Sequence, residues 1–163
     1  MDVEIRQATA DDAEQVGVFQ TRAWADSYEG IVPGSYLAAT TAQMRAERWR
    51  DRLARGRRRA WLAFTPNELV GVASTSATAD DRPDRPDLPP LELSSIYVDR
   101  TVLGRGVAQM LLDATIGDRP AHLWVFTANV RAQRFYIKQG FVASNETQLD
   151  PDTGVMEVRW VRH

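Results

Sequence analysis

The feature that most constrains this chain is a strand-like segment, a glycine turn and a helix-like segment in direct succession. Residues 91–98 alternate as a strand does, Gly104-Arg105-Gly106 follows, and residues 107–116 carry apolar side chains at helical spacing. The first turn of a helix leaves N–H groups without intrahelical acceptors, and glycine lets an anion approach them. The unit therefore predicts a phosphate-holding turn in an α/β domain, although a turn that only needs flexible glycines has the same sequence.

Two common phosphate-binding fingerprints are not met. The third glycine of Gly-x-Gly-x-x-Gly would fall at Gln109, and no Gly-Lys-Ser/Thr occurs. A mononucleotide-binding α/β domain is therefore the less favoured interpretation.

The rest of the chain alternates between strand and helix periodicity. In the first part of the chain we expect a strand at 3–7, a helix from the Thr9–Asp12 capping box to about Ser27, and a helix that ends near Gly56 with core candidates Met44, Trp49 and Leu53. A hairpin of 59–65 and 69–75 and a Pro- and Asp-rich loop at 79–90 follow. In the last part we expect strands at 91–98 and 122–126, helices at 107–116 and 130–139, and two last strands around 151–154. This order predicts a mixed sheet covered by helices.

Composition excludes several classes of protein and site. The 163 residues suit one domain, and a net charge of −2 argues against a general nucleic-acid or anionic-membrane binder. The absence of cysteine rules out disulfides, thiolate metal ligands and a cysteine nucleophile, and two histidines give a metal centre little to draw on. No apolar run approaches membrane-spanning length. We expect a cytoplasmic protein without a metal.

A second informative block runs from Asn129 to Phe141. On a helix, four of its side chains share one face at i, i+3, i+4 and i+7, namely Ala132, Phe135, Tyr136 and Gln139. Phe135 is expected in the core, whereas a buried tyrosine hydroxyl needs a partner or a function. Asn129 suits either a ligand contact or a helix N-cap.

These two blocks resemble the GCN5-related N-acetyltransferase (GNAT) superfamily. Its Asn-x-x-Ala-x-x-Phe-Tyr-x-x-x-Gly-Phe pattern is met at every named position from Asn129 to Phe141. Its Gln/Arg-x-x-Gly-x-Gly/Ala loop is met at Gly106 and Ala108, with Leu103 in place of Gln or Arg. The resemblance is strong over residues 91–142 and weaker over 24–33.

The resemblance implies a single domain over residues 1–163, with a mixed, mostly antiparallel sheet of about seven strands and about four helices. It implies transfer of an acetyl group from acetyl-CoA to a primary amine by direct attack in a ternary complex. The residues implied to bind the coenzyme are Ile96, Tyr97, Val98, Leu103, Gly104, Arg105, Gly106, Val107, Ala108, Asn129 and Tyr136.

The resemblance also implies residue roles. Tyr136 is the expected general acid at the coenzyme A sulfur, and Glu92 is a possible base, with a solvated strand carboxylate as the alternative. A backbone N–H between Ile96 and Val98 is implied to stabilise the oxyanion. Strict alternation would place Glu92, Ser94 and Ile96 on one face of the strand and Leu91, Leu93 and Ser95 on the other. Candidate substrate-binding residues are Trp24, Tyr28 and Ser94.

The acceptor and the partners are less constrained. A small-molecule or peptide amine is expected, with neither nucleic acid nor membrane as a partner and with a homodimer possible. The acidic loop at Asp80, Asp81, Asp84 and Asp87 is a candidate attractor for a cationic amine. The eight arginines between Arg45 and Arg59 are expected on a solvated helix face, and His122 in a structural role. A non-catalytic acyl-CoA-binding sensor or interaction module is the alternative function.

Overall fold

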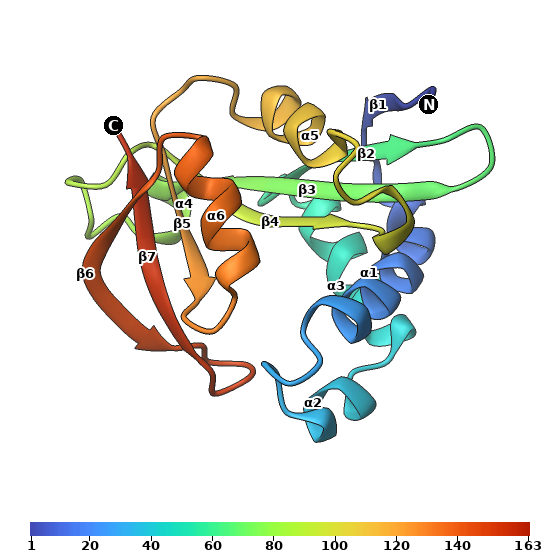
Figure 1. Ribbon diagram of the computed structural model, residues 1–163, viewed down its shortest axis with the longest axis horizontal. Coiled ribbons are helices and arrows are strands. Elements are labelled where there is room, and N and C mark those ends of the chain that lie inside the picture. The colour runs from blue at the N-terminus through green and yellow to red at the C-terminus, as the bar shows by residue number, and fades with distance from the viewer.

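The computed structural model describes residues 1–163 and is built on one seven-stranded sheet (Figure 1). The strand order is β1-β2-β3-β4-β5-β7-β6, and only the β4–β5 pair is parallel. The strands are β1 (Glu4–Gln7), β2 (Arg59–Phe64), β3 (Leu69–Ala77), β4 (Leu91–Val98), β5 (Ala121–Phe126), β6 (Val142–Leu149) and β7 (Met156–Arg162). The expected mixed, mostly antiparallel sheet is thus confirmed.

Helices cover both faces of the sheet. Helices α1 (Ala13–Ser27) and α3 (Ala42–Ala54) pack with β2 and β3 around Phe19, Trp49 and Leu62. Helices α5 (Val107–Thr115) and α6 (Val130–Lys138) cover the opposite face, where Leu112, Tyr136 and Trp160 belong to one core cluster. Each of these four helices was expected from apolar spacing, and each buries apolar or aromatic side chains against the sheet.

Shorter elements complete the chain. Helix α2 (Gly34–Ala39) and helix α4 (Thr78–Asp81) were not expected, and two 3₁₀ turns, η1 (Ala10–Asp12) and η2 (Arg100–Val102), precede α1 and α5. Asp12 accepts a hydrogen bond from Thr9 N–H at 2.8 Å, as in the expected capping box. Met44 was wrongly expected in the core, because its side chain is 40% exposed on the outer face of α3. No helix is long and apolar enough to cross a membrane.

The centre of the sheet is opened by two irregularities of β4. Strand β4 pairs with β5 only at Leu91 and Glu92, after which the two strands diverge, as Figure 1 shows. The register of β4 against β3 also shifts at Ser94, which marks a β-bulge. The divergence from β5 leaves one edge of β4 unpaired beyond Glu92, in the middle of the domain, whereas the bulge lies on the β3 side.

The bulge corrects the expected alternation along β4. Ser95 bonds Ser74 and Ser94 bonds Ser76, through hydroxyl pairs at 2.6 and 3.0 Å, so both serines lie on the side of the sheet that carries Ser74 and Ser76. Ile96 instead packs in the clusters of the opposite face. One extra residue in a strand reverses every later side chain, which is why strict alternation failed here.

Candidate active site

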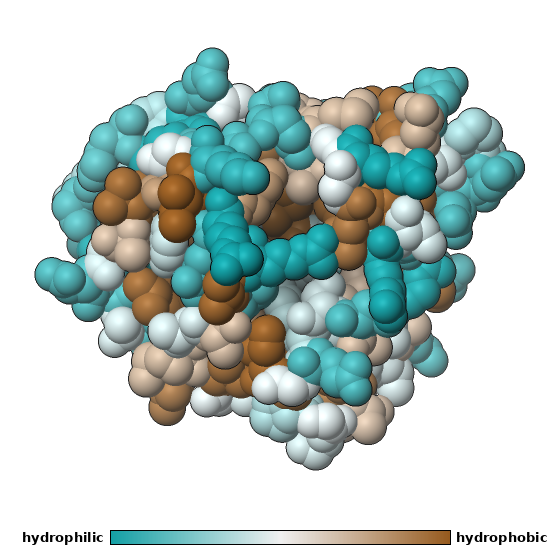
Figure 2. Space-filling view, viewed as in Figure 1, coloured by the Kyte–Doolittle hydropathy of each residue, from teal (hydrophilic) through white to brown (hydrophobic).

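A cavity of about 1200 Å³ lies where β4 and β5 separate. Its walls come from α1 and α3 on one side and from the N-terminal ends of α5 and α6 on the other. The space-filling view shows the surface hollowed near the centre of this face, with brown and teal residues around the opening (Figure 2). The cavity therefore joins the two sequence blocks that carry the predicted site.

The glycine turn is shaped to admit an anion. Gly104 and Gly106 have φ angles of +76° and +82°, which L side chains rarely adopt, and a Cβ on either would meet no atom within 4 Å. Gly106 is the N-cap of α5, and the amides of residues 106 to 109 donate to no protein acceptor. Free amides at a positive helix terminus are a physical basis for phosphate binding.

The free edge of β4 supplies further donors. Asp99 N–H bonds Val70 C=O, at 2.8 Å, on the β3 side. Because N–H groups alternate in direction along an antiparallel strand, those of Ile96 and Val98 point toward the gap beside β5. Both residues line the cavity. The backbone donors expected between Ile96 and Val98 therefore face the cavity.

Tyr136 lies in the wall of this cavity. Its ring packs against Phe135 and Phe141 at centroid distances of 5.5 and 5.7 Å. The residue is 7% exposed, and its hydroxyl makes no hydrogen bond within the protein. Burial raises the pKa of the Tyr136 phenol, so the hydroxyl stays protonated at neutral pH. A protonated phenol without a protein partner is thus available to a ligand.

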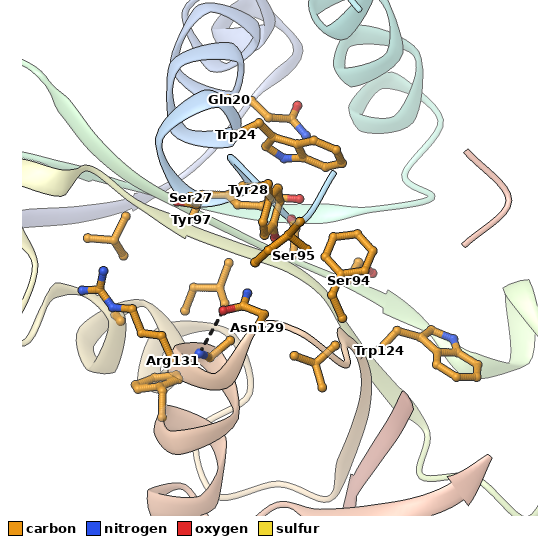
Figure 3. Close-up of a pocket in the computed structure, with 18 of the residues that line it drawn as sticks. Gln20, Trp24, Ser27, Tyr28, Ser94, Ser95, Tyr97, Trp124, Asn129 and Arg131 are labelled. Carbon is orange, nitrogen blue, oxygen red and sulfur yellow. Dashed lines mark hydrogen bonds between the residues drawn. The ribbon is translucent and has the colours of Figure 1, made fainter. Parts of the chain in front are cut away.

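Asn129 caps helix α6 and also lies in the wall of the cavity. Its side-chain oxygen accepts from Ala132 N–H at 3.3 Å and caps α6, as the dashed line in Figure 3 shows. The residue also lines the cavity. Since the cap uses the oxygen, the amide nitrogen keeps its hydrogens for other acceptors.

Two carboxylates line the cavity, one on β4 and one on β7, the strands on either side of β5. Glu92 was expected there, and burial raises its pKa. Glu157, on β7 opposite Phe126 of β5, was not expected. Burial raises the pKa of Glu157 to about 7, and Gln148 donates a hydrogen bond of 2.6 Å to its Oε1. A carboxyl with a pKa near neutrality is suited to proton exchange.

An aromatic wall closes the α1 side of the cavity. Tyr28 meets Trp24 edge-on at 4.9 Å and reaches Phe126 at 5.2 Å and Tyr97 at 6.4 Å. Figure 3 shows Trp24, Tyr28 and Tyr97 grouped beside α1. Burial raises the pKa of the Tyr28 and Tyr97 phenols. Trp24, Tyr28 and Ser94, the candidate substrate-binding residues, all line this region.

Arginine side chains that were expected on a solvated helix face line the cavity. Arg45, Arg48, Arg52 and Arg58 line it, so the expectation that the arginine-rich segment forms only a solvated face was wrong. Arg45 is buried and bonds Thr40 C=O at 2.6 Å, and it stacks over Trp24. Near the glycine turn, Arg100 and Arg131 line the cavity.

Some of the other predicted residues line the cavity and others lie outside it. Leu103, Val107 and Ala108 line the cavity beside the glycines, whereas Arg105 does not. The acidic loop is also outside the cavity. Its Asp84 and Asp87 pair with Arg82 and Arg85 at 3.4 and 2.9 Å.

His122 has the structural role that was expected. It is fully buried, with Arg159 donating to Nδ1 and Thr78 Oγ1 lying 2.8 Å from Nε2. Since Arg159 can only donate, Nε2 carries the proton of the neutral ring. Burial lowers the pKa of His122 to about 4, which keeps the ring neutral. This network ties the 79–90 segment to the sheet.

Comparisons with known proteins agree with this geometry. The chain shares its fold with the PaiA N-acetyltransferase of Thermoplasma acidophilum in complex with coenzyme A (TM-score 0.69, 19% identity, 96% of this chain and 98% of that chain). It also shares its fold with apo YjaB of Escherichia coli (TM-score 0.73, 16% identity, 99% of this chain and 97% of that chain). Arabidopsis thaliana NAA60 in complex with a bisubstrate analogue is similar as well (TM-score 0.68, 16% identity, 98% of this chain and 97% of that chain). No curated protein sequence matches significantly. The family model described as "Acetyltransferase (GNAT) domain" matches residues 10–155, and since this span is most of the chain, the protein belongs to the GNAT acetyltransferase family.

Proposed function

We propose that this protein transfers an acetyl group from acetyl-CoA to a primary amine by direct attack while both substrates are bound. One observation carries the proposal: the free amides of the glycine turn, the Tyr136 hydroxyl and two carboxylates open into a single cavity. A module that only held acyl-CoA would need the amides but neither an unpartnered phenol nor a carboxylate base.

The cavity fits the parts of acetyl-CoA. The amides of Gly104 and of residues 106–109, which have no protein acceptor, would hold the diphosphate, and Arg100 and Arg131, which line the same cavity, would neutralise it. The gap between β4 and β5 would accept the pantetheine arm. There the N–H groups of Ile96 and Val98 and the amide of Asn129 are the available donors.

The acceptor amine must lose a proton before it attacks. An alkylammonium with a pKa near 10.4 is neutral in only about 4 molecules in 10,000 at pH 7. Glu157 would take this proton, with Glu92 near enough to raise the Glu157 pKa and to share the role. No covalent enzyme intermediate is needed, which is consistent with a chain that has no cysteine.

The departing sulfur must gain a proton as the new amide forms. Tyr136 would supply it, because its hydroxyl is protonated and lacks a protein acceptor. The apolar surroundings that raise the Tyr136 pKa also raise the basicity of a thiolate formed beside it. Burial therefore does not by itself oppose the transfer.

The direct test combines acetyl-CoA binding by calorimetry with thiol release over a panel of primary amines. We expect binding and amine-dependent release of coenzyme A. Tight binding of acetyl-CoA with no release for any amine class would favour the non-catalytic module. Affinity for ATP or NAD without affinity for acetyl-CoA would remove the proposal altogether.

The role of Glu157 has a pH signature. A base with a pKa of about 7 is protonated and inactive at lower pH, so kcat/KM should fall as pH decreases through 7. Glu157→Gln keeps an oxygen for Gln148 but cannot take a proton. It should abolish this acidic limb of the pH profile, the fall of kcat/KM below pH 7, and should lower kcat/KM about 100-fold at pH 8.

The matched control is Glu92→Gln, measured over the same pH range. If Glu157 is the principal base, this variant keeps the fall in kcat/KM at low pH but shifts it below pH 7, because the Glu92 charge no longer raises the Glu157 pKa. A limb that survives in Glu157→Gln and disappears in Glu92→Gln would assign the base to Glu92 instead.

A further inference from the structure

Three arginines form a cationic wall at the acceptor side of the cavity. Arg48 and Arg52 are one turn apart on α3 and therefore share a face, and Arg58 follows in the segment that leads to β2. All three line the cavity, and Arg52 and Arg58 are partly buried. This wall, Arg48/Arg52/Arg58, is distant in sequence from the glycine turn and plays no part in the proposed chemistry.

None of the three guanidinium groups has a partner in the protein. No hydrogen bond or ion pair joins Arg48, Arg52 or Arg58 to an acidic or carbonyl oxygen. Other arginines of this chain behave differently. Arg45 bonds Thr40 C=O, and Arg55 pairs with Asp51 at 2.7 Å.

The repulsion among these three charges is offset within the protein only in part, by Asp152 acting on Arg52 and by Glu92 acting on Arg58. Burial, together with the charges of Arg58 and Arg48, lowers the pKa of Arg52. Partly desolvated like charges repel, and a bound anion would offset both the repulsion and the lost hydration. Guanidinium groups bind compact oxyanions through paired hydrogen bonds, which surface lysines do not provide.

The wall and the carboxylates of the proposed acceptor site line the same cavity. Arg58 is the cation that lowers the Glu92 pKa most, so these two charges share one region of the cavity. Glu157 and Asp152 line this cavity too, and the charge of Asp152 acts on Arg52. An acceptor lying here meets negative charge on the side of β4 and β7 and positive charge on the side of α3.

We infer that the acceptor is a small zwitterionic amine, whose ammonium lies toward Glu92 and Glu157 and whose carboxylate or similar compact oxyanion is bound by the Arg48/Arg52/Arg58 wall. This inference rests on the proposed acetyl transfer and specifies its substrate class. It favours amino acids and aminoalkyl phosphonates over polyamines, which would place a second cation against the wall.

The test uses pairs of acceptors with and without the anion, α-amino acids and their amides, assayed by coenzyme A release at a pH-independent kcat/KM for each amine. We expect the wild-type protein to prefer the acid in kcat/KM. Arg52→Gln and Arg58→Gln should each reduce that preference about tenfold or more, because each removes a charge-assisted hydrogen bond. Arg50→Gln is the control, since Arg50 is exposed on the same helix and does not line the cavity.

A binding measurement makes the result independent of turnover. N-acetyl amino acids and their amides, titrated calorimetrically with coenzyme A present, should show the same preference and the same loss in Arg52→Gln. Equal binding of acid and amide to the wild-type protein, or equal weakening of both by Arg52→Gln, would overturn the inference. Acetylation of polyamines in preference to zwitterions would overturn it while leaving the proposed acetyl transfer intact.

Discussion

Replacing Tyr136 with phenylalanine is expected to lower kcat for acetyl transfer by about 100- to 1000-fold, with the dissociation constant for acetyl-CoA changed less than about threefold. The substitution removes one oxygen and keeps the ring against Phe135 and Phe141, so the core around α6 should be unchanged. What is lost is the hydrogen that stabilises the leaving sulfur, equivalent to about 3–4 kcal/mol of activation free energy. Thiol release at saturating substrates and calorimetry measure the two quantities separately.

Tyr97→Phe is the matched control for Tyr136→Phe. Tyr97 also lines the cavity, and burial likewise raises its pKa, but its ring belongs to the aromatic wall near Trp24. If any cavity phenol served equally, both variants would lose activity alike. Full turnover by Tyr136→Phe would refute the proton-donor role, and an equal loss in Tyr97→Phe would reduce Tyr136 to one member of a polar lining.

Local sequence patterns account for most of the fold because each element satisfies its own rules. The helix at 130–138 follows from an N-cap at Asn129 and an apolar face, and Gly140 ends it with a φ of +84°. The Asn129–Phe141 block therefore placed Tyr136 from sequence alone, since a residue's face on a regular helix is fixed by spacing.

Irregular backbone is where sequence patterns fail. Nothing in Leu-Glu-Leu-Ser-Ser-Ile-Tyr-Val marks the extra residue at Ser94, because a bulge depends on how β4 meets β3 rather than on β4 itself. The consequence reaches the site, since the bulge brings Ser95 to the side of Ser74 and turns Ile96 to the opposite face. Here one misplaced residue changes which side chains can contact a ligand.

Long-range assembly explains the residues that the sequence did not identify. Glu157 lies on β7, and the Arg48/Arg52/Arg58 wall lies on α3 and in the segment that follows it. The alternating or helical polarity of these segments also describes an ordinary solvated face. Their role depends on β7 lying beside β5 and on α3 lying across the sheet. The visible sign was an excess of arginine on one short helix without acidic residues at matching i, i+4 positions for most of them.

Gly106→Val is expected to raise the dissociation constant for acetyl-CoA by about 100-fold or more. Gly106 has a φ of +82° at the N-terminus of α5, so a β-branched residue there must shift the backbone that orients the free amides. Its side chain would also enter the open space beside the turn. Losing one or two charge-assisted hydrogen bonds to a diphosphate accounts for this magnitude.

The control for Gly106→Val is Gly56→Val, which imposes a similar strain outside the cavity. Gly56 has a φ of +65°, and a Cβ there also meets no atom within 4 Å. Both variants should lose similar stability in thermal unfolding, whereas only Gly106→Val should lose acetyl-CoA binding in calorimetry. If both bind acetyl-CoA as the wild-type protein does, the diphosphate is not held at this turn, and the sulfur has no reason to lie beside Tyr136. The position of the anion thus determines whether the phenol and the carboxylates act on one reaction.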